Sequence, residues 1–328
     1  YSYEDTEKAL SLFGTFLEYN ESMELVENIT ISFKNAGHIL GSASVKIDYI
    51  EDSMKKSAIF SGDIGQQSRM TTSEIDFWES GNYVFMESTY GDRLHPNLEI
   101  SMKDFKRKVL ETLEQRAVVV IPSFALERTQ EILFLLKQMS EDGLLKDVPV
   151  YLDSPLAINV TKTFIKYPGL FNKDIQQLIK SGRNPFIFDE LIHTYTKEES
   201  IQINEKTGPK VIIAGSGMCE GGRVKYHLSR YLQSSLNIVI FVGYQVQGTL
   251  GRKILDGQKK VIIDDYEVEI SAQIRLIDGL SAHADQNNLI EFVKDFKDIF
   301  CILNRSNSFF VAYAVIVALM SPKLSPFA

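Results

Sequence analysis

Cysteine is scarce in this chain, with Cys219 and Cys301 as the only two among 328 residues. Two thiols are too few for a disulfide framework or for a zinc site built from cysteine thiolates. We therefore expect a reducing compartment and a cytoplasmic protein. The first residues contain neither a basic segment nor a long apolar run, so no secretory signal is recognised. Because Tyr1 is not methionine, we expect that the chain begins inside a longer protein.

An excess of positive charge is also missing. The chain has 35 lysine and arginine residues against 43 aspartate and glutamate residues, which gives a net charge of −8. This balance argues against a surface that holds nucleic acid by bulk charge and leaves local sites as the route to such binding. Hydrophobic residues at 44% and charged residues at 24% are ordinary for a globular protein, so disorder and a fibre are both excluded.

Long apolar runs are absent except for one, FFVAYAVIVALM at 309–320. It is shorter than the roughly 20 residues that span a bilayer, so we expect no membrane segment. Two interpretations remain open for this stretch. It is either a buried strand or helix, or a non-native tail that arose from a frameshift or an assembly error.

The hydrophobic pattern divides the chain, which shows no repeat and no Pro/Gly linker. Within residues 28–65 and 82–88, short stretches are apolar or alternate between apolar and polar residues, are rich in β-branched residues and often end at glycines. This pattern predicts a sheet of hairpin-like units. A helix is expected next, from Ser101 to about Gln115. From about Ala117 short apolar strands alternate with helices, as in a doubly wound parallel sheet. An alternating pattern then returns, followed by a helix that Asp285 is expected to cap. We therefore expect an α/β domain inserted into a host domain.

Two strand ends in the first section carry potential metal ligands, His38 in AGHILGSAS and Asp63 in SGDIG. Each lies where an apolar strand gives way to glycines, a position from which a rigid scaffold can present ligands. Imidazole together with carboxylate suits zinc or a similar ion, and an aspartate can bridge two metals. Taken alone, a histidine near a glycine and a Gly-Asp turn are also common in ordinary turns.

Two further residues are candidates for proton transfer. Glu87 follows the apolar run YVFM, where a carboxylate can orient a histidine or hold a catalytic proton. His283 in GLSAHADQ lies between a strand and a helix, where it could act as a general acid or face a metal through Asp285. The alternatives are a surface turn for Glu87 and a histidine that only packs in a capping loop.

Three strand-to-helix turns of the middle section are candidates for phosphate binding. In GSGMCEGGRVKYH the backbone N–H groups from Ser216 to Gly222 can form an anion nest at a helix N-terminus, and Arg223 adds charge. Each turn alone is a common connection, but three turns on one sheet edge would form a track. The residues expected along it are Ser123, Arg128, Ser216, Gly217, Gly221, Gly222, Arg223, Thr249 and Arg252.

Seven segments occur in the order AGHILGSAS, SGDIG, ESTYGDR, IPSFALERTQE, GSGMCEGGR, GYQVQGTLGR and SAHAD. This order closely resembles the β-CASP branch of the metallo-β-lactamase superfamily, which includes bacterial and archaeal RNA nucleases and the endonuclease subunit of the eukaryotic mRNA 3′-end cleavage machinery. The resemblance implies an αββα metallo-hydrolase sandwich interrupted by a β-CASP domain with a doubly wound sheet. The expected domains are 1–118 (metallo-β-lactamase, first part), 119–255 (β-CASP), 256–298 (metallo-β-lactamase, return segment) and 299–328 (atypical apolar tail).

The resemblance also implies roles for individual residues. His38 would ligate one zinc, Asp63 would bridge two zinc ions, and Glu87 would pair with His283, which protonates the leaving oxygen. Ser281 and the track described above would hold the RNA backbone. The implied function is a zinc-dependent ribonuclease, acting as an endonuclease, a 5′–3′ exonuclease or both in RNA processing or decay.

Two ligand motifs of the family are not found in this sequence. The His-x-His-x-Asp-His run would precede Tyr1, and the last zinc histidine is not recognised in IFCILNRSNSFF, where Asn304 stands near its expected position. We therefore expect the intact active site to hold two zinc ions and this chain by itself to bind far less zinc and to be inactive.

Two other functions remain open from the sequence. Some relatives keep the fold but lose metal ligands, so a non-catalytic RNA-binding scaffold is one alternative, and a DNA nuclease of a sister branch is another. RNA is the expected partner, with a homodimer as a further possibility. Three histidines, His95, His193 and His227, match no ligand of the family, and His227 is expected to be a surface or packing residue.

Overall fold

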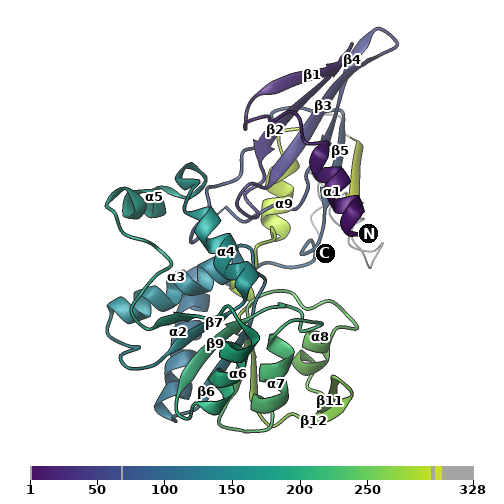
Figure 1. The fold of residues 1–328 in the computed structure, drawn as a ribbon. Helices are drawn as coiled ribbons and strands as arrows, with labels where there is room; N and C mark the ends of the chain where they lie inside the picture. Colours follow the sequence, from purple (N-terminus) through teal and green to yellow (C-terminus); the bar gives the residue numbers. More distant parts are fainter. Residues whose placement is uncertain (1, 68, 297–299, 305–328) are drawn as a thin grey trace, which may run out of the picture. The chain divides into compact units, whose positions relative to one another are not determined.

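The computed structural model describes residues 2–67, 69–296 and 300–304 (Figure 1). The chain forms two compact units. The first unit comprises residues 1–67, 74–94 and 283–328, and the second comprises residues 68–73 and 95–282. The second unit is therefore an insertion into the first, as the change of pattern along the sequence predicts. The apolar stretch 309–320 lies outside the described residues.

The first unit contains a six-stranded sheet in the order β1-β2-β3-β4-β5-β14. Strands β1 to β4 form an antiparallel meander, whereas β5 pairs with β4 and with β14 in parallel. Its elements are α1 (Tyr3–Ser11), β1 (Ser22–Val26), β2 (Ile29–Asn35), β3 (Ala43–Glu51), β4 (Met54–Phe60), β5 (Tyr83–Glu87), α9 (Gln286–Val293) and β14 (Phe300–Asn304).

Helix α9 packs on this sheet through an apolar core. Phe292 and Leu289 of α9 are buried together with Ile59 of β4 and Val84 of β5. The helix begins at the predicted cap, because the side chain of Asp285 accepts a hydrogen bond from the N–H of Asn288 at 3.1 Å. The prediction of a helix capped by Asp285 is confirmed, and the cap fixes the chain directly after His283.

The second unit contains a six-stranded, fully parallel sheet in the order β13-β10-β6-β9-β7-β8. A two-stranded antiparallel ribbon, β11-β12, accompanies it. Its elements are α2 (Leu98–Glu114), β6 (Val118–Pro122), α3 (Arg128–Glu141), β7 (Val150–Asp153), α4 (Pro155–Phe164), η1 (Pro168–Leu170), α5 (Lys173–Lys180), β8 (Leu191–His193), α6 (Lys197–Glu205), β9 (Lys210–Ala214), α7 (Val224–Tyr231), β10 (Ile238–Phe241), α8 (Leu250–Leu255), β11 (Lys260–Ile263), β12 (Tyr266–Glu269), β13 (Gln273–Leu276) and η2 (Asp278–Leu280).

The central strands of this sheet are buried along their whole length. Every residue of β6, β9 and β10 is buried, and both α2 and α7 contact β6. Burial on both faces explains why these strands read as continuous apolar runs rather than as alternating ones. The α/β fold with an inserted parallel sheet, predicted from the sequence, is confirmed.

The limits of the two compact units differ from the domain limits that the sequence suggests near residues 118 and 255. Helix α2 and the segment 256–282 belong to the second unit, because α2 packs against β6 and β13 extends the parallel sheet. Among the described residues, no helix is both long and apolar enough to cross a membrane.

Candidate functional site

The first unit brings three of the predicted site residues together where its strands end. One ligand atom from each of His38, Asp63 and His283 lies within 4.8 Å of the other two. Nε2 of His38 is 3.8 Å from an Asp63 carboxylate oxygen, and the ring centroids of His38 and His283 are 4.5 Å apart. His38 follows β2 and Asp63 follows β4, so the ends of these two strands position both residues at the same end of the sheet.

Glu87, the last residue of β5, joins this cluster through His283. Its carboxylate lies 3.0 and 3.3 Å from Nδ1 of His283. The carboxylate also accepts a hydrogen bond from the N–H of Ile64, and the N–H of Glu87 donates to Ser61 Oγ at 3.1 Å. A carboxylate on Nδ1 fixes the ring and directs Nε2 away from Glu87, toward any group held beside it. The resemblance to the β-CASP branch implied this pairing, and the geometry agrees with it.

The electrostatics of the cluster favour a bound cation. Burial raises the pKa of Asp63, and the nearby Glu87 carboxylate raises it further, whereas His283 opposes the shift. Two carboxylates held together repel each other, and a positive ion beside them offsets that repulsion. Two imidazoles and a carboxylate are also the donor set that suits zinc. The cluster therefore fits a metal ion held by His38 and Asp63, with the ring of His283 beside it.

Backbone contact between two loops holds His38 and Asp63 near each other. Gly65 donates its N–H to the carbonyl of Ala36 at 2.9 Å, and a Cβ at residue 65 would lie only 1.8 Å from the carbonyl oxygen of Gly37. Only glycine permits this approach. Asn35 supports the same loop, since its side-chain oxygen accepts from the N–H of Gly37 at 2.9 Å. Sequence reasoning did not single out Gly65 or Asn35.

The second unit gathers the three predicted phosphate turns at one edge of its sheet. Strands β10, β6 and β9 are neighbours, and the carboxyl ends of parallel strands meet at the same edge. The glycine loop, residues 215–223, follows β9, the segment with Ser123 follows β6, and the segment with Thr249 follows β10. The turns also contact one another, because the N–H of Ser123 donates to the carbonyl of Ala214 at 3.0 Å.

Hydrogen bonds within the glycine loop use some of its donors and leave others for a ligand. The N–H of Ser216 donates to the Gly221 carbonyl at 3.0 Å, and the N–H of Gly221 donates to Ser216 Oγ at 3.3 Å. Within the described residues, no such partner is found for the N–H groups of Gly217, Met218, Glu220 and Gly222. These four donors, in the loop before α7, are the part of the expected anion nest that remains open.

The turn after β10 forms hydrogen bonds with the glycine loop. The carboxylate of Glu220 accepts from the N–H of Leu250, and the N–H of Gly251 donates to the carbonyl of Met218 at 3.1 Å. The hydroxyl of Thr249 caps α8 by accepting from the N–H of Arg252 at 3.2 Å. Arg252 itself pairs with Asp256 in the next turn of the helix.

Two of the predicted phosphate ligands make their main contacts inside the protein. Arg128 is buried and forms an ion pair with Glu131 on the same helix. Arg223 donates to the carboxylate of Asp153 at 2.7 Å and to the carbonyl of Tyr195 at 2.8 Å. Their guanidinium groups support the turns from within. Ser281, which follows η2, is also buried.

Two family models match this chain in sequence order. The Beta-Casp domain matches residues 129–254, and the Zn-dependent metallo-hydrolase RNA specificity domain matches residues 267–305. The second match includes His283 and the strand that pairs with β5, whereas the first covers the glycine loop.

Several curated proteins are similar over most of this chain. A ribonuclease of Thermus thermophilus is 35% identical over 89% of this chain and 66% of its own length. An RNase J-like protein of Methanocaldococcus jannaschii is 34% identical over 90% of this chain and 67% of its own length. The transcription termination factor FttA of Methanosarcina mazei is 32% identical over 85% of this chain, which spans 45% of that protein.

The chain belongs to the β-CASP family of metallo-β-lactamase-fold nucleases. The description of the second family model also implies a metal, in agreement with the donor set of His38, Asp63 and His283. In this β-CASP protein the cluster of His38, Asp63 and His283 belongs to the host unit, whereas the glycine loop and the turns with Ser123 and Thr249 belong to the inserted one.

A buried network behind the glycine loop was not predicted from the sequence. Its centre is Asp153, the last residue of β7, which is fully buried and accepts from Arg223. It also accepts hydrogen bonds from Ser200 Oγ at 2.5 Å and Thr194 Oγ1 at 2.6 Å and faces His227 Nε2 at 2.7 Å. His227 is fully buried, so of the two expected positions the packing one is confirmed and the surface one is wrong. A buried carboxylate with this many donors needs them to be stable.

The hydrogen bonds of this network lower the pKa of Asp153 to about 2, although burial alone would raise it. The donors from His227, Ser200, Thr194 and Arg223 favour the charged form. Because Arg223 directly precedes α7 and His227 lies in its first half, the carboxylate holds the helix that follows the glycine loop. The signal in the sequence was weak, since an aspartate after a buried strand also occurs in ordinary turns.

Replacing Gly65 tests whether the close approach of the two loops is needed. Gly65→Ala should lower the free energy of unfolding of this chain by about 1 to 3 kcal/mol, because the added methyl group overpacks against the Gly37 backbone. Urea unfolding measures the change. Gly14→Ala is the matched control, since a Cβ at residue 14 meets nothing within 4 Å. Equal effects of the two substitutions would show that the loops do not meet as described.

The pKa of Asp153 predicts a pH-dependent contribution to stability. The folded pKa of about 2 lies below the ordinary value of 3.8, so the contribution is present above pH 4 and is lost as the pH falls through 2. Asp153→Asn should therefore cost about 2 kcal/mol at pH 7, and the difference from the wild type should shrink toward pH 2. Urea unfolding between pH 2.5 and 7 measures this, with the exposed Asp52→Asn as control. A difference that stays constant with pH would contradict the prediction.

Proposed function

We propose that the protein to which this chain belongs is a metal-dependent ribonuclease that hydrolyses phosphodiester bonds of RNA. The observation that carries this proposal is the cluster of His38, Asp63 and His283, with Glu87 on the imidazole of His283. The chain spans about two thirds or less of the relatives compared above, so activity, substrate and partners of the whole protein are part of the proposal.

The chemistry divides among the residues of the cluster. His38 and Asp63 would hold zinc, two ions in the intact active site, which lowers the pKa of bound water and stabilises charge on the scissile phosphate. Glu87 keeps the His283 ring in place by accepting from Nδ1. His283 then presents Nε2 and donates a proton to the leaving oxygen.

The inserted unit would hold the RNA backbone near its sheet edge. The N–H groups of Gly217 and Gly222 lie at the N-terminus of α7, a position that favours a phosphate group. Contacts with phosphates need no excess of basic surface, which suits a chain with a net charge of −8. The remaining residues proposed to contact RNA along this track are Ser123, Ser216, Gly221, Thr249 and Arg252. Arg128, Arg223 and Ser281, which the sequence also suggested, would act from within the protein by supporting these turns.

An RNA-binding scaffold without catalysis is the second candidate. It is favoured by the number of metal donors, because the described residues bring together only the three of this cluster. Such a protein would keep the glycine loop but would not cleave RNA. The experiment below separates the two functions, since a scaffold has no cleavage for a substitution to remove.

Asp63 tests the metal-dependent reaction. In the intact protein, Asp63→Ala should abolish cleavage of labelled RNA, because it removes charge and a ligand from the metal site. Chelation with EDTA should have the same effect on the wild type. Asp48→Ala, on β3 and outside the cluster, should cleave at the wild-type rate. Wild-type cleavage by Asp63→Ala would refute the proposed site, and an intact wild-type protein that never cleaves RNA would favour the scaffold.

A further inference from the structure

A cavity of about 320 Å³ opens at the edge of the parallel sheet opposite the glycine loop. Val118, Lys210 and Asn237 line it at the points where β6, β9 and β10 begin. The glycine loop follows the other end of β9, so the cavity is separate from the proposed RNA track. Its volume is in the range of cavities that bind small ligands.

The charges around this cavity are unbalanced. Within the described part of the chain, none of the four basic residues that line it forms an ion pair. One acidic residue, Glu205, lines it as well. Gathering positive charge in this way costs stability unless an anion offsets it, and it stands out in a chain with a net charge of −8. The four basic residues are Arg116, Lys206, Lys210 and Arg230.

The environment of the Lys210 side chain shows how strongly positive this cavity is. Its side chain is buried, and its ammonium group donates to the carbonyl of Ile203 at 3.0 Å and to that of Lys206. Burial lowers the pKa of Lys210, and the positive charges of Arg230 and Lys206 lower it further. The two carbonyls satisfy hydrogen bonds of the ammonium group, but they leave its net charge unmatched.

A buried polar group in the wall of the cavity, Asn204, adds a donor to this positive charge. Asn204 is 5% exposed, and its amide nitrogen makes no hydrogen bond to the described residues. The side-chain oxygen of Asn204 lies 3.1 Å from His227 Nδ1, which leaves the amide nitrogen for the cavity. Buried donors without partners are costly, so a ligand that accepts from them gains affinity.

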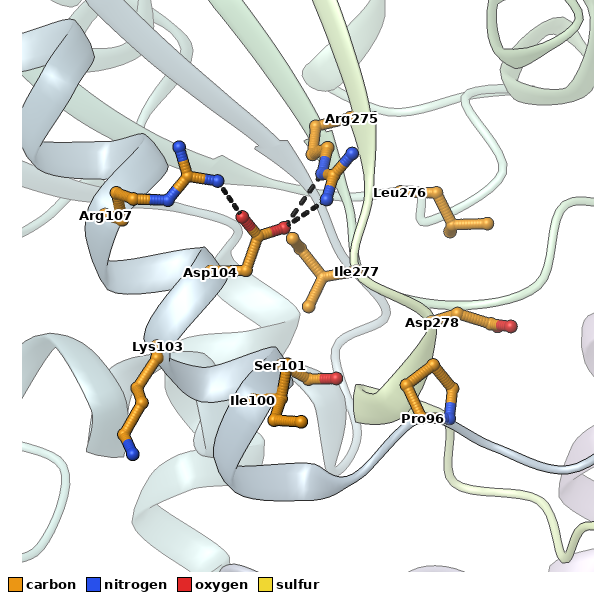
Figure 2. Close-up of a pocket in the computed structure, with 10 residues that line it drawn as sticks. All are labelled: Pro96, Ile100, Ser101, Lys103, Asp104, Arg107, Arg275, Leu276, Ile277 and Asp278. Carbon is orange, nitrogen blue, oxygen red and sulfur yellow. Dashed lines mark hydrogen bonds and ion pairs between the residues drawn. The ribbon is translucent and has the colours of Figure 1, made fainter.

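A second, larger cavity provides the contrast. It has a volume of about 470 Å³ and lies between α2 and β13. Figure 2 shows Arg107 and Arg275 both directed at the carboxylate of Asp104, and Arg275 approaches it to 2.6 Å. The guanidinium charges there are already neutralised by the protein. A high density of arginine alone therefore does not distinguish the smaller cavity, whereas its unmatched charge does.

We propose that the smaller cavity binds the phosphate group of a small phosphate monoester. Arg116, Arg230 and Lys210 would offset the charge of the dianion, and Asn204 would donate a hydrogen bond to one of its oxygens. Apolar Leu236 and Ala117, which also line the cavity, would contact the organic part. This site does not depend on the nuclease activity, because it uses neither the metal cluster nor the glycine loop.

Calorimetric titration of this chain tests the proposal, with inorganic phosphate and adenosine 5′-monophosphate as probes in EDTA and at constant ionic strength. The wild type should bind both, and the double variant Arg116→Gln with Arg230→Gln should bind about a hundredfold more weakly, or tenfold for each lost charged contact. Both arginines are exposed, so the variant should remain folded, and circular dichroism checks this. Lys206→Gln, also at an exposed residue, should weaken binding by about tenfold.

The matched control is the double variant Arg107→Gln with Arg275→Gln in the larger cavity, which should bind like the wild type. Equal affinity for the two probes would assign the site to free phosphate, and tighter binding of the nucleotide would assign it to a phosphorylated nucleoside. The proposal is overturned by no binding to the wild type at millimolar concentrations. An unchanged affinity in the Arg116 and Arg230 variant, or an equal loss in the control, would also overturn it.

Discussion

The hydrogen bonds of the Glu87 carboxylate are the interaction on which the cluster of His38, Asp63 and His283 depends. The carboxylate connects His283 to a strand that lies 196 residues earlier in the sequence, and it also accepts from the N–H of Ile64, next to Asp63. One side chain thus holds both the histidine and the aspartate loop. A buried carboxylate is stable only when its hydrogen bonds are satisfied, so the cluster and the strand end stabilise each other. The insertion of a whole α/β unit between these segments leaves this contact intact.

A second carboxylate, Asp153, has the corresponding role in the inserted unit. It is fully buried at the end of β7 and binds the beginning of α7 through Arg223 and His227. The glycine loop lies between β9 and this helix, so both of its ends are fixed to the sheet. The N–H groups of Gly217 and Gly222 are then available at a rigid helix N-terminus. Fixed donors bind an anion without the entropic cost of ordering a mobile loop.

The sequence alone revealed much of the fold and part of the candidate site. Apolar strands alternating with helices predicted the parallel sheet, because burial on both faces leaves a strong local pattern. The strand ends at His38 and Asp63 were recognisable because alternating or apolar strands give way to glycines there, and the one at Glu87 because it follows the apolar run YVFM. Their order along the chain, rather than any one of them, indicated the family.

Features that depend on contacts between distant residues could not be predicted in this way. Glycine is required at residue 65 because this residue lies against the backbone of Gly37, and no local sequence pattern indicates that contact. His227 is buried because Asp153, 74 residues earlier, faces it. The basic cavity is formed by the segments around Arg116, Lys206 and Arg230. From the sequence alone, each of these three residues would be expected to be an ordinary charged residue in contact with solvent.

The central claim is that His38 and Asp63 hold the metal and that Glu87 keeps His283 beside it. Anomalous diffraction at the zinc absorption edge, from crystals of the intact protein grown with zinc, tests it most directly. The account predicts a zinc peak about 2.0 to 2.2 Å from His38 Nε2 and from a carboxylate oxygen of Asp63. Zinc bound only elsewhere, with His38 and Asp63 making no contact to it, would contradict the account.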